Sequence, residues 1–213
     1  MPGSYFCNMQ TYFVSGIGTD VGKTVTAAIL TEALAADYWK PVQAGDLHNT
    51  DTMKVQRLVS NDSTVFHKTV YDLNTPMSPH AAAEIDGVSI DLKKISRPKT
   101  KNDLIIEGAG GLLVPLNDKD TVLDLAKPTD HIIVVSRHYL GSINHSLMSL
   151  ELLKSRGFKQ ISLIFSGDEH PTTEGIITTM HPDVPVIGRI DQEPYFDKNV
   201  IRDYADQFKA KLK

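Results

Sequence analysis

The chain has 213 residues, of which 41% are hydrophobic and 23% charged, and its formal net charge is -4. This length supports one sizeable hydrophobic core and is short for two, so we expect a single domain over residues 1–213, with 1–9 as a candidate disordered segment. The charges are scattered without a basic patch, which excludes nucleic acid as a partner. No apolar run is long enough to span a membrane. The chain has one cysteine and no visible signal peptide, which favours a cytoplasmic protein.

Short apolar runs alternate with longer helix-like stretches along the chain. Near-continuous apolar runs are typical of parallel strands that are buried on both faces of a sheet. They predict strands at residues 11–15, 38–42, 103–107, 131–136, 161–165 and 184–190. One helix is predicted at residues 24–36, which are rich in Ala and Leu. A second helix is predicted at residues 143–156 and ends before Gly157. The alternation predicts a doubly wound α/β fold with a mostly parallel sheet, in which ligands bind at the carboxyl ends of the strands.

The most specific motif follows the first predicted strand and runs from Gly16 to Thr24, with five residues between Gly16 and Gly22. Glycines let backbone N–H groups approach phosphate oxygens, and the following helix directs its N-terminal dipole at the anion. Lys23 supplies a positive charge for the β- and γ-phosphates, and the Thr24 hydroxyl can ligate Mg2+. This pattern predicts a P-loop NTPase-like domain that binds ATP. The predicted nucleotide contacts in the loop are Asp20, Val21, Gly22, Lys23, Thr24 and Val25.

Two acidic residues are candidate ligands of the same metal, because Mg2+ usually takes one or two carboxylates besides phosphate oxygens. Glu107 closes a predicted apolar strand and leads into a glycine-rich turn. A carboxylate buried at that point would be unfavourable without a partner. Asp51 opens a predicted helix, where it is either a metal ligand or an ordinary acid of the first turn. We therefore predict a Mg2+ site formed by Thr24, Asp51 and Glu107.

Several ordered motifs together resemble those of the dethiobiotin synthetase family over most of the chain. Any one of them would be a weak match, but their shared order makes the resemblance specific. Besides the elongated phosphate loop with an acid at Asp20, the matching segments are Lys40-Pro41-Val42-Gln43-Ala44-Gly45, Asn49-Thr50-Asp51, Ser78-Pro79-His80, Glu107-Gly108-Ala109-Gly110-Gly111 and Leu140-Gly141-Ser142-Ile143-Asn144-His145.

This resemblance implies a reaction in which 7,8-diaminononanoate, CO2 and MgATP give dethiobiotin, ADP and phosphate. One substrate amine forms a carbamate with CO2, the carbamate attacks the γ-phosphate to give a carbamic-phosphoric anhydride, and the second amine closes the ring. The resemblance also implies that Lys23 and Lys40 are catalytic, and that the enzyme is a homodimer in which residues 141–144 serve the neighbouring subunit's site. The further ATP contacts that it implies are Gly108, Ala109, Gly110 and Ser166, and the substrate contacts are Thr19, Lys40, Ala44, Gly141, Ser142, Ile143 and Asn144.

The sequence departs from the family pattern where substrate and adenine are expected. Ala44 stands where the family often has Ser or Thr, which removes one hydroxyl. Ser166 stands where an Asn commonly reads the adenine edge, and Asp191 stands where a turn proline is expected. We therefore expect looser selectivity for the nucleotide base.

Two other classes of P-loop protein are alternatives. A cobyric acid-type, ATP-dependent amide synthase domain has a similar loop, but such chains normally carry a glutaminase domain with a nucleophilic cysteine. A partitioning-type ATPase carries an additional lysine early in its loop, and residues 16–21 contain none. Residues 199–213 could suggest a membrane-surface helix, but Asp203 and Asp206 offset its lysines, so we interpret it as a solvated closing helix.

Overall fold

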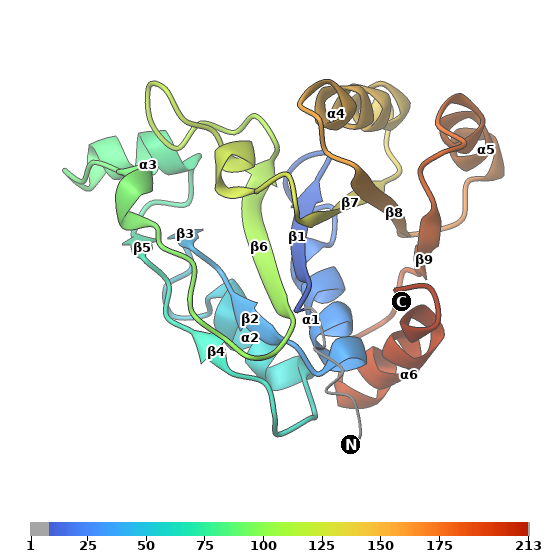
Figure 1. The fold of residues 1–213 in the computed structure, drawn as a ribbon, viewed down its shortest axis with the longest axis horizontal. Helices are drawn as coiled ribbons and strands as arrows, with labels where there is room; N and C mark the ends of the chain where they lie inside the picture. The colour runs from blue at the N-terminus through green and yellow to red at the C-terminus, as the bar shows by residue number, and fades with distance from the viewer. Residues whose placement is uncertain (1–8, 213) are drawn as a thin grey trace, which may run out of the picture.

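A seven-stranded sheet, in which all neighbouring strands are parallel, forms the centre of the molecule (Figure 1). This computed structural model describes residues 9–212, so residues 1–8 of the candidate disordered segment lie outside the described part. The predicted α/β fold with a mostly parallel sheet is confirmed. The strands, in order across the sheet, are β4 (Phe66–His67), β2 (Asp37–Trp39), β6 (Leu104–Gly111), β1 (Thr11–Gly16), β7 (His131–Arg137), β8 (Gln160–Ser166) and β9 (Val186–Ile190).

The apolar runs form the strands because each strand is buried on both faces by helices. Predictions for β1, β7 and β8 agree with the structure to within one residue at each end. Strand β6 extends four residues beyond its predicted end, into the glycine-rich turn after Glu107. Strand β9 begins two residues later than predicted, directly after Pro185, which has no backbone N–H to donate to the ladder.

The single strand predicted at residues 38–42 is wrong, because the chain breaks there into two strands of different sheets. Strand β2 ends at Trp39, and β3 (Val42–Ala44) pairs with β5 (Tyr71–Leu73) in a separate two-stranded sheet. Proline lacks a backbone donor and is confined to the edges of sheets. Pro41 fits this rule, because only its carbonyl is used, accepting from the N–H groups of residues 70 and 71. Lys40 consequently lies at the point where the chain leaves the main sheet.

Helices cover the two faces of the main sheet. On one face, α1 (Lys23–Leu34) packs against α2 (Asp51–Leu58) and α6 (Lys198–Lys209), and their buried side chains share one core cluster with the sheet. A second cluster on the opposite face includes side chains of α3 (Pro79–Ile85), α4 (Ser142–Ser155), α5 (Pro171–Met180) and the short 3-10 helix η2 (Val122–Leu125). Another 3-10 helix, η1 (Leu92–Lys94), lies in the connection before β6. Figure 1 shows α4 and α5 above the sheet, and α1 and α6 below it.

The C-terminal helix is only partly solvated, which corrects the expectation of a solvated closing helix. Its start is fixed by Asp197, whose carboxylate accepts from the N–H groups of residues 199 and 200. One face of α6 is buried by Ile201, Tyr204 and Phe208 against α1. Its charged residues occupy the other face, so the pattern has the helical period of an amphipathic packing helix. Among the described residues, no helix combines the length and apolar character that crossing a membrane requires.

Candidate active site

The phosphate loop connects β1 to α1 at the carboxyl edge of the sheet. Gly22 caps α1 with a φ of 99°, a left-handed conformation that side chains with a Cβ rarely adopt. A Cβ there would lie 2.8 Å from the Ser166 hydroxyl oxygen. Val21 is buried in the core beside α1, so it supports the loop from within. The free N–H groups of α1 therefore open onto the cavity described below, as anion binding requires.

Lys23 is the first residue of α1, and its side chain folds back across the phosphate loop. Its Nζ donates to the Gly18 carbonyl at 2.8 Å, and the side chain is almost fully buried. Burial, followed by the positive charge of Lys40, lowers the pKa of Lys23 to about 8. A nucleotide phosphate beside Nζ would favour the charged form again.

Glu107, in the middle of β6, is bonded to three side chains of the site. Its Oε1 accepts from the Thr24 hydroxyl at 2.9 Å and from Lys40 Nζ at 3.0 Å, and its Oε2 accepts from the Tyr38 hydroxyl at 2.8 Å. Only 1% of Glu107 is exposed. The partner that a buried carboxylate needs is thus Lys40, which directly follows strand β2.

Lys40 bridges two carboxylates that are distant in sequence. Its Nζ lies 2.7 Å from Asp51 Oδ2 and 3.0 Å from Glu107 Oε1, and it donates to the Gly108 carbonyl at 3.0 Å. Although burial opposes the charge of Lys40, Glu107 and Asp51 raise the pKa of Lys40 above its ordinary value. We call Lys40, Asp51 and Glu107 the charge cluster. It keeps a cation fixed beside the phosphate loop.

Asp51 lies at the start of a helix, as its sequence position predicted. It is the first residue of α2, whose start is capped by the Thr50 hydroxyl, and its backbone N–H donates to Gln43 Oε1 at 3.1 Å. Burial raises the pKa of Asp51, but Lys40 and then Lys54 more than offset this and lower it to about 2. Asp51 is therefore ionised throughout the working pH range.

Thr24, Asp51 and Glu107 fit a divalent cation of the Mg2+ type. They supply hard oxygen donors, the ligands that Mg2+ prefers. All three residues line one cavity together with Lys23 of the phosphate loop, so a cation held by them would lie beside the phosphates.

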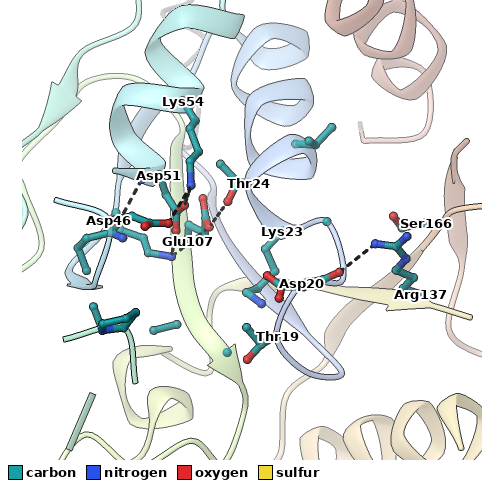
Figure 2. A pocket seen from close by; sticks show the side chains of 18 of the residues that line it. Thr19, Asp20, Lys23, Thr24, Asp46, Asp51, Lys54, Glu107, Arg137 and Ser166 are labelled. Atoms are coloured by element: carbon teal, nitrogen blue, oxygen red, sulfur yellow. Dashed lines mark hydrogen bonds and ion pairs between the residues drawn. The ribbon is translucent and has the colours of Figure 1, made fainter. Parts of the chain in front are cut away.

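A cavity of about 790 Å3 extends from the charge cluster across the phosphate loop. Figure 2 shows Lys23 between Asp51 and Glu107 on one side and Arg137 and Ser166 on the other. Of the predicted contacts, those that line the cavity are Thr19, Asp20, Gly22, Lys23, Thr24, Val25, Lys40, Ala44, Asp51, Glu107, Ala109, Gly110 and Ser166. Most of the predicted ATP and substrate contacts are thus brought together.

The predicted substrate contacts at residues 141–144 lie elsewhere. Gly141 precedes α4 with a φ of 103°, and Ser142 is buried at the start of that helix. Ile143 and Asn144 are exposed and do not line this cavity. Gly108 also does not line it, and takes part through its carbonyl bond to Lys40.

Sequence reasoning missed several residues of the site. Arg137 ends β7, donates to the Asp20 carbonyl at 3.2 Å and to Gln192 Oε1 at 3.1 Å, and so ties the phosphate loop to the segment after β9. Its position at the carboxyl end of a predicted strand was the available signal. Tyr38 was missed because it does not line the cavity and reaches the site only through Glu107, so it carries no motif. Gln43 lines the cavity and belongs to the Lys40–Gly45 motif, but it was not singled out.

The fold and this arrangement define a P-loop nucleotide-binding protein. A family model described as an AAA domain matches residues 10–200. Among solved structures, the MinC:MinD cell division protein complex of Aquifex aeolicus aligns with a TM-score of 0.57 at 15% identity, over 95% of this chain and 95% of that chain. The ParA family ATPase of Chlorobium tepidum aligns with a TM-score of 0.55 at 15% identity, over 92% of this chain and 98% of that chain. At such identities the likeness concerns the fold alone.

Two curated relatives are much more similar in sequence, and both are named ATP-dependent dethiobiotin synthetase BioD. The protein of Christiangramia forsetii is 61% identical over 203 residues, covering 95% of this chain and 98% of the relative. That of Cytophaga hutchinsonii is 46% identical over 199 residues, covering 92% of this chain and 96% of the relative. The chain belongs to the ATP-dependent dethiobiotin synthetase family, and is an ATP-binding ligase of biotin biosynthesis. This decides against the amide synthase and partitioning ATPase alternatives.

Proposed function

We propose that this enzyme carboxylates 7,8-diaminononanoate with CO2 and closes the ureido ring, using Mg2+ and ATP, to give dethiobiotin, ADP and phosphate. The observation that carries the proposal is the fixed cation of the charge cluster, which opens onto the same cavity as the phosphate loop. The relatives named dethiobiotin synthetase support the same reaction.

The residues suit a reaction that gathers several negative charges. The carbamate oxygen attacks the γ-phosphorus, the bond from that phosphorus to the bridging oxygen breaks, and ADP leaves. The second amine then attacks the carbamoyl carbon and phosphate leaves. Lys23 faces the phosphates from the loop, and Lys40 faces them from the strand end. Cations held in advance stabilise charge that develops on the transferring phosphoryl group.

Mg2+ would be held by Thr24, Asp51 and Glu107 together with nucleotide oxygens, and would supply charge neutralisation at the phosphates when bound. Thr19 lines the cavity beside the loop and is a candidate contact for the carbamate side of the substrate. Ser166 lines the cavity on the other side of the loop and is a candidate contact for the nucleoside.

Phosphate release should require diaminononanoate, bicarbonate, Mg2+ and ATP together. Each should be omitted in turn, with phosphate measured continuously and dethiobiotin quantified by mass spectrometry. We expect equal amounts of both products in the complete mixture and background release in every omission. Equal phosphate release without the diamine would contradict the proposal, because the ATPase activity would then be independent of this substrate.

We further propose a homodimer in which residues 141–144 complete the neighbouring subunit's substrate site. Four exposed apolar side chains near the start of α4 support this: Tyr139, Leu140, Ile143 and Met148. Free N–H groups at this helix start, with the Asn144 amide, suit the substrate carboxylate. The long apolar middle of the substrate would separate this carboxylate from the ATP.

Mixing Lys40→Ala with Asn144→Ala subunits should restore activity. If each pocket takes Lys40 from one chain and Asn144 from the other, every mixed dimer has one intact pocket. Random exchange makes about half of the dimers mixed, so symmetry predicts recovery to roughly a quarter of wild-type activity. Mixing Lys40→Ala with the double variant is the matched control and should restore nothing. An absence of recovery, despite exchange proven by native mass spectrometry, would refute the shared site.

A further inference from the structure

The two carboxylate oxygens of Glu107 have different surroundings. Oε1 contacts the Thr24 hydroxyl and Lys40, both of which line the cavity. Oε2 points away from them and accepts from the Tyr38 hydroxyl at 2.8 Å. Tyr38 does not line the cavity and is fully buried. One oxygen of Glu107 therefore serves the site, and the other is held from within the protein.

Tyr38 is itself rigidly placed. Strand β2 pairs with β6 in a parallel register that sets Tyr38 opposite Ile105, two residues before Glu107. The Tyr38 ring lies in the core cluster beside α1, with its centroid 6.0 Å from that of Phe66. The Tyr38 phenol is the donor of the hydrogen bond to Glu107, because an ionised carboxylate can only accept.

We propose that Tyr38 is the positioning residue for Glu107, holding Oε2 in the core so that Oε1 faces Thr24, Lys40 and the metal. This inference rests on the proposed function, in which Glu107 helps to hold Mg2+. Tyr38 and Lys40 belong to the same short stretch of chain and act on opposite oxygens of one carboxylate. The orientation of Glu107 is thereby set from both sides.

Removal of the Tyr38 hydroxyl would leave Oε2 buried without a donor. The carboxylate would then turn toward its remaining partners, Thr24 and Lys40. Mg2+ demands near-ideal octahedral geometry, so a rotated carboxylate is a poorer ligand. The expected defect therefore concerns the metal-dependent part of nucleotide binding, and the metal-independent part should be retained.

The test compares Tyr38→Phe with Tyr12→Phe, and measures ADP affinity by calorimetry in Mg2+ and in EDTA. Tyr12 is a matched control, because it lies in the same core cluster and its hydroxyl donates to the Leu212 carbonyl at 3.1 Å, remote from the site. Loss of one hydrogen bond to a charged group should reduce the Mg2+-dependent gain in ADP affinity by about tenfold in Tyr38→Phe. Affinity in EDTA should change little, and Tyr12→Phe should behave as wild type in both media.

A double-mutant cycle with Glu107→Gln separates positioning from general packing. If Tyr38 acts through Glu107, then Tyr38→Phe should add little to the defect of Glu107→Gln. Both tyrosine variants keep the aromatic ring, and their melting temperatures show how much stability each hydroxyl contributes. An undiminished Mg2+-dependent gain in Tyr38→Phe, with only the melting temperature lowered, would overturn the proposal. ADP binding involves neither diamine nor bicarbonate, so this outcome is independent of whether the proposed reaction is correct.

Discussion

Lys40→Ala should lower kcat by about a hundredfold or more, as expected for the loss of one preorganised electrostatic stabiliser. Lys40 is held beside the phosphate loop by Asp51 at 2.7 Å and Glu107 at 3.0 Å, so its charge is in place before the reaction begins. A group that stabilises charge developing only in the transition state affects kcat more than binding. The KM for ATP should therefore stay within a few-fold of wild type.

Steady-state kinetics over a range of ATP concentrations measure both quantities. Lys154→Ala is a suitable control, because Lys154 pairs with Asp183 at 2.7 Å in an ion pair that does not line the cavity. Removing one partner of a buried ion pair costs about 3–5 kcal/mol of stability. The assays should therefore be run below the melting temperature of the variant. Lys40→Met, which keeps the length of the side chain, checks that the lost charge is responsible. A raised KM with unchanged kcat would show that Lys40 acts only in binding.

Gly22→Ala should weaken ATP binding by about tenfold or more, since a side chain in the left-handed region costs roughly 1–2 kcal/mol. The φ of Gly22 is 99°, and its added Cβ would lie 2.8 Å from the Ser166 hydroxyl oxygen. Because Gly22 also caps α1, relief of this strain would move the N–H groups that face the phosphates. Calorimetric titration with ATP measures the effect directly.

Gly175→Ala is the matched control for Gly22→Ala. Gly175 lies inside α5, where an added Cβ meets no atom within 4 Å. The substitution should leave ATP affinity unchanged and raise stability by roughly 0.5–1 kcal/mol, as alanine is preferred to glycine within helices. In a Ser166→Ala background, Gly22→Ala loses the close contact with the Ser166 hydroxyl but keeps the backbone strain. This double variant therefore separates the two effects. Wild-type ATP affinity in Gly22→Ala would refute the role assigned to this backbone conformation.

The sequence by itself determined the features that depend on neighbouring residues. The phosphate loop could be predicted because strand, glycines, Lys23 and helix follow one another without interruption. Five strands of the main sheet, β1, β6, β7, β8 and β9, could be predicted because burial on both faces requires continuous apolar runs. Asp51 could be singled out because it opens a helix, and Glu107 because it follows an apolar run and precedes a glycine-rich segment.

Only the tertiary structure decided how distant segments meet. The break after Trp39 depends on the pairing of β3 with β5, and strands of two or three residues carry too little periodicity to be recognised. The burial of one face of α6 depends on α1, more than 160 residues earlier in the chain. Local charge along α6 indicates only that part of it meets water.

The charge cluster shows most clearly which features depend on local sequence and which depend on the tertiary structure. Lys40, Asp51 and Glu107 each had a local reason to be noticed, but their mutual distances follow from the placing of β2 beside β6 and of α2 against α1. Tyr38 had no local signal, because its hydroxyl contacts the site only through Glu107. A sequence specifies which groups are present at the ends of its strands. The order of the strands, fixed by the packing of the whole core, decides which of those groups share one site.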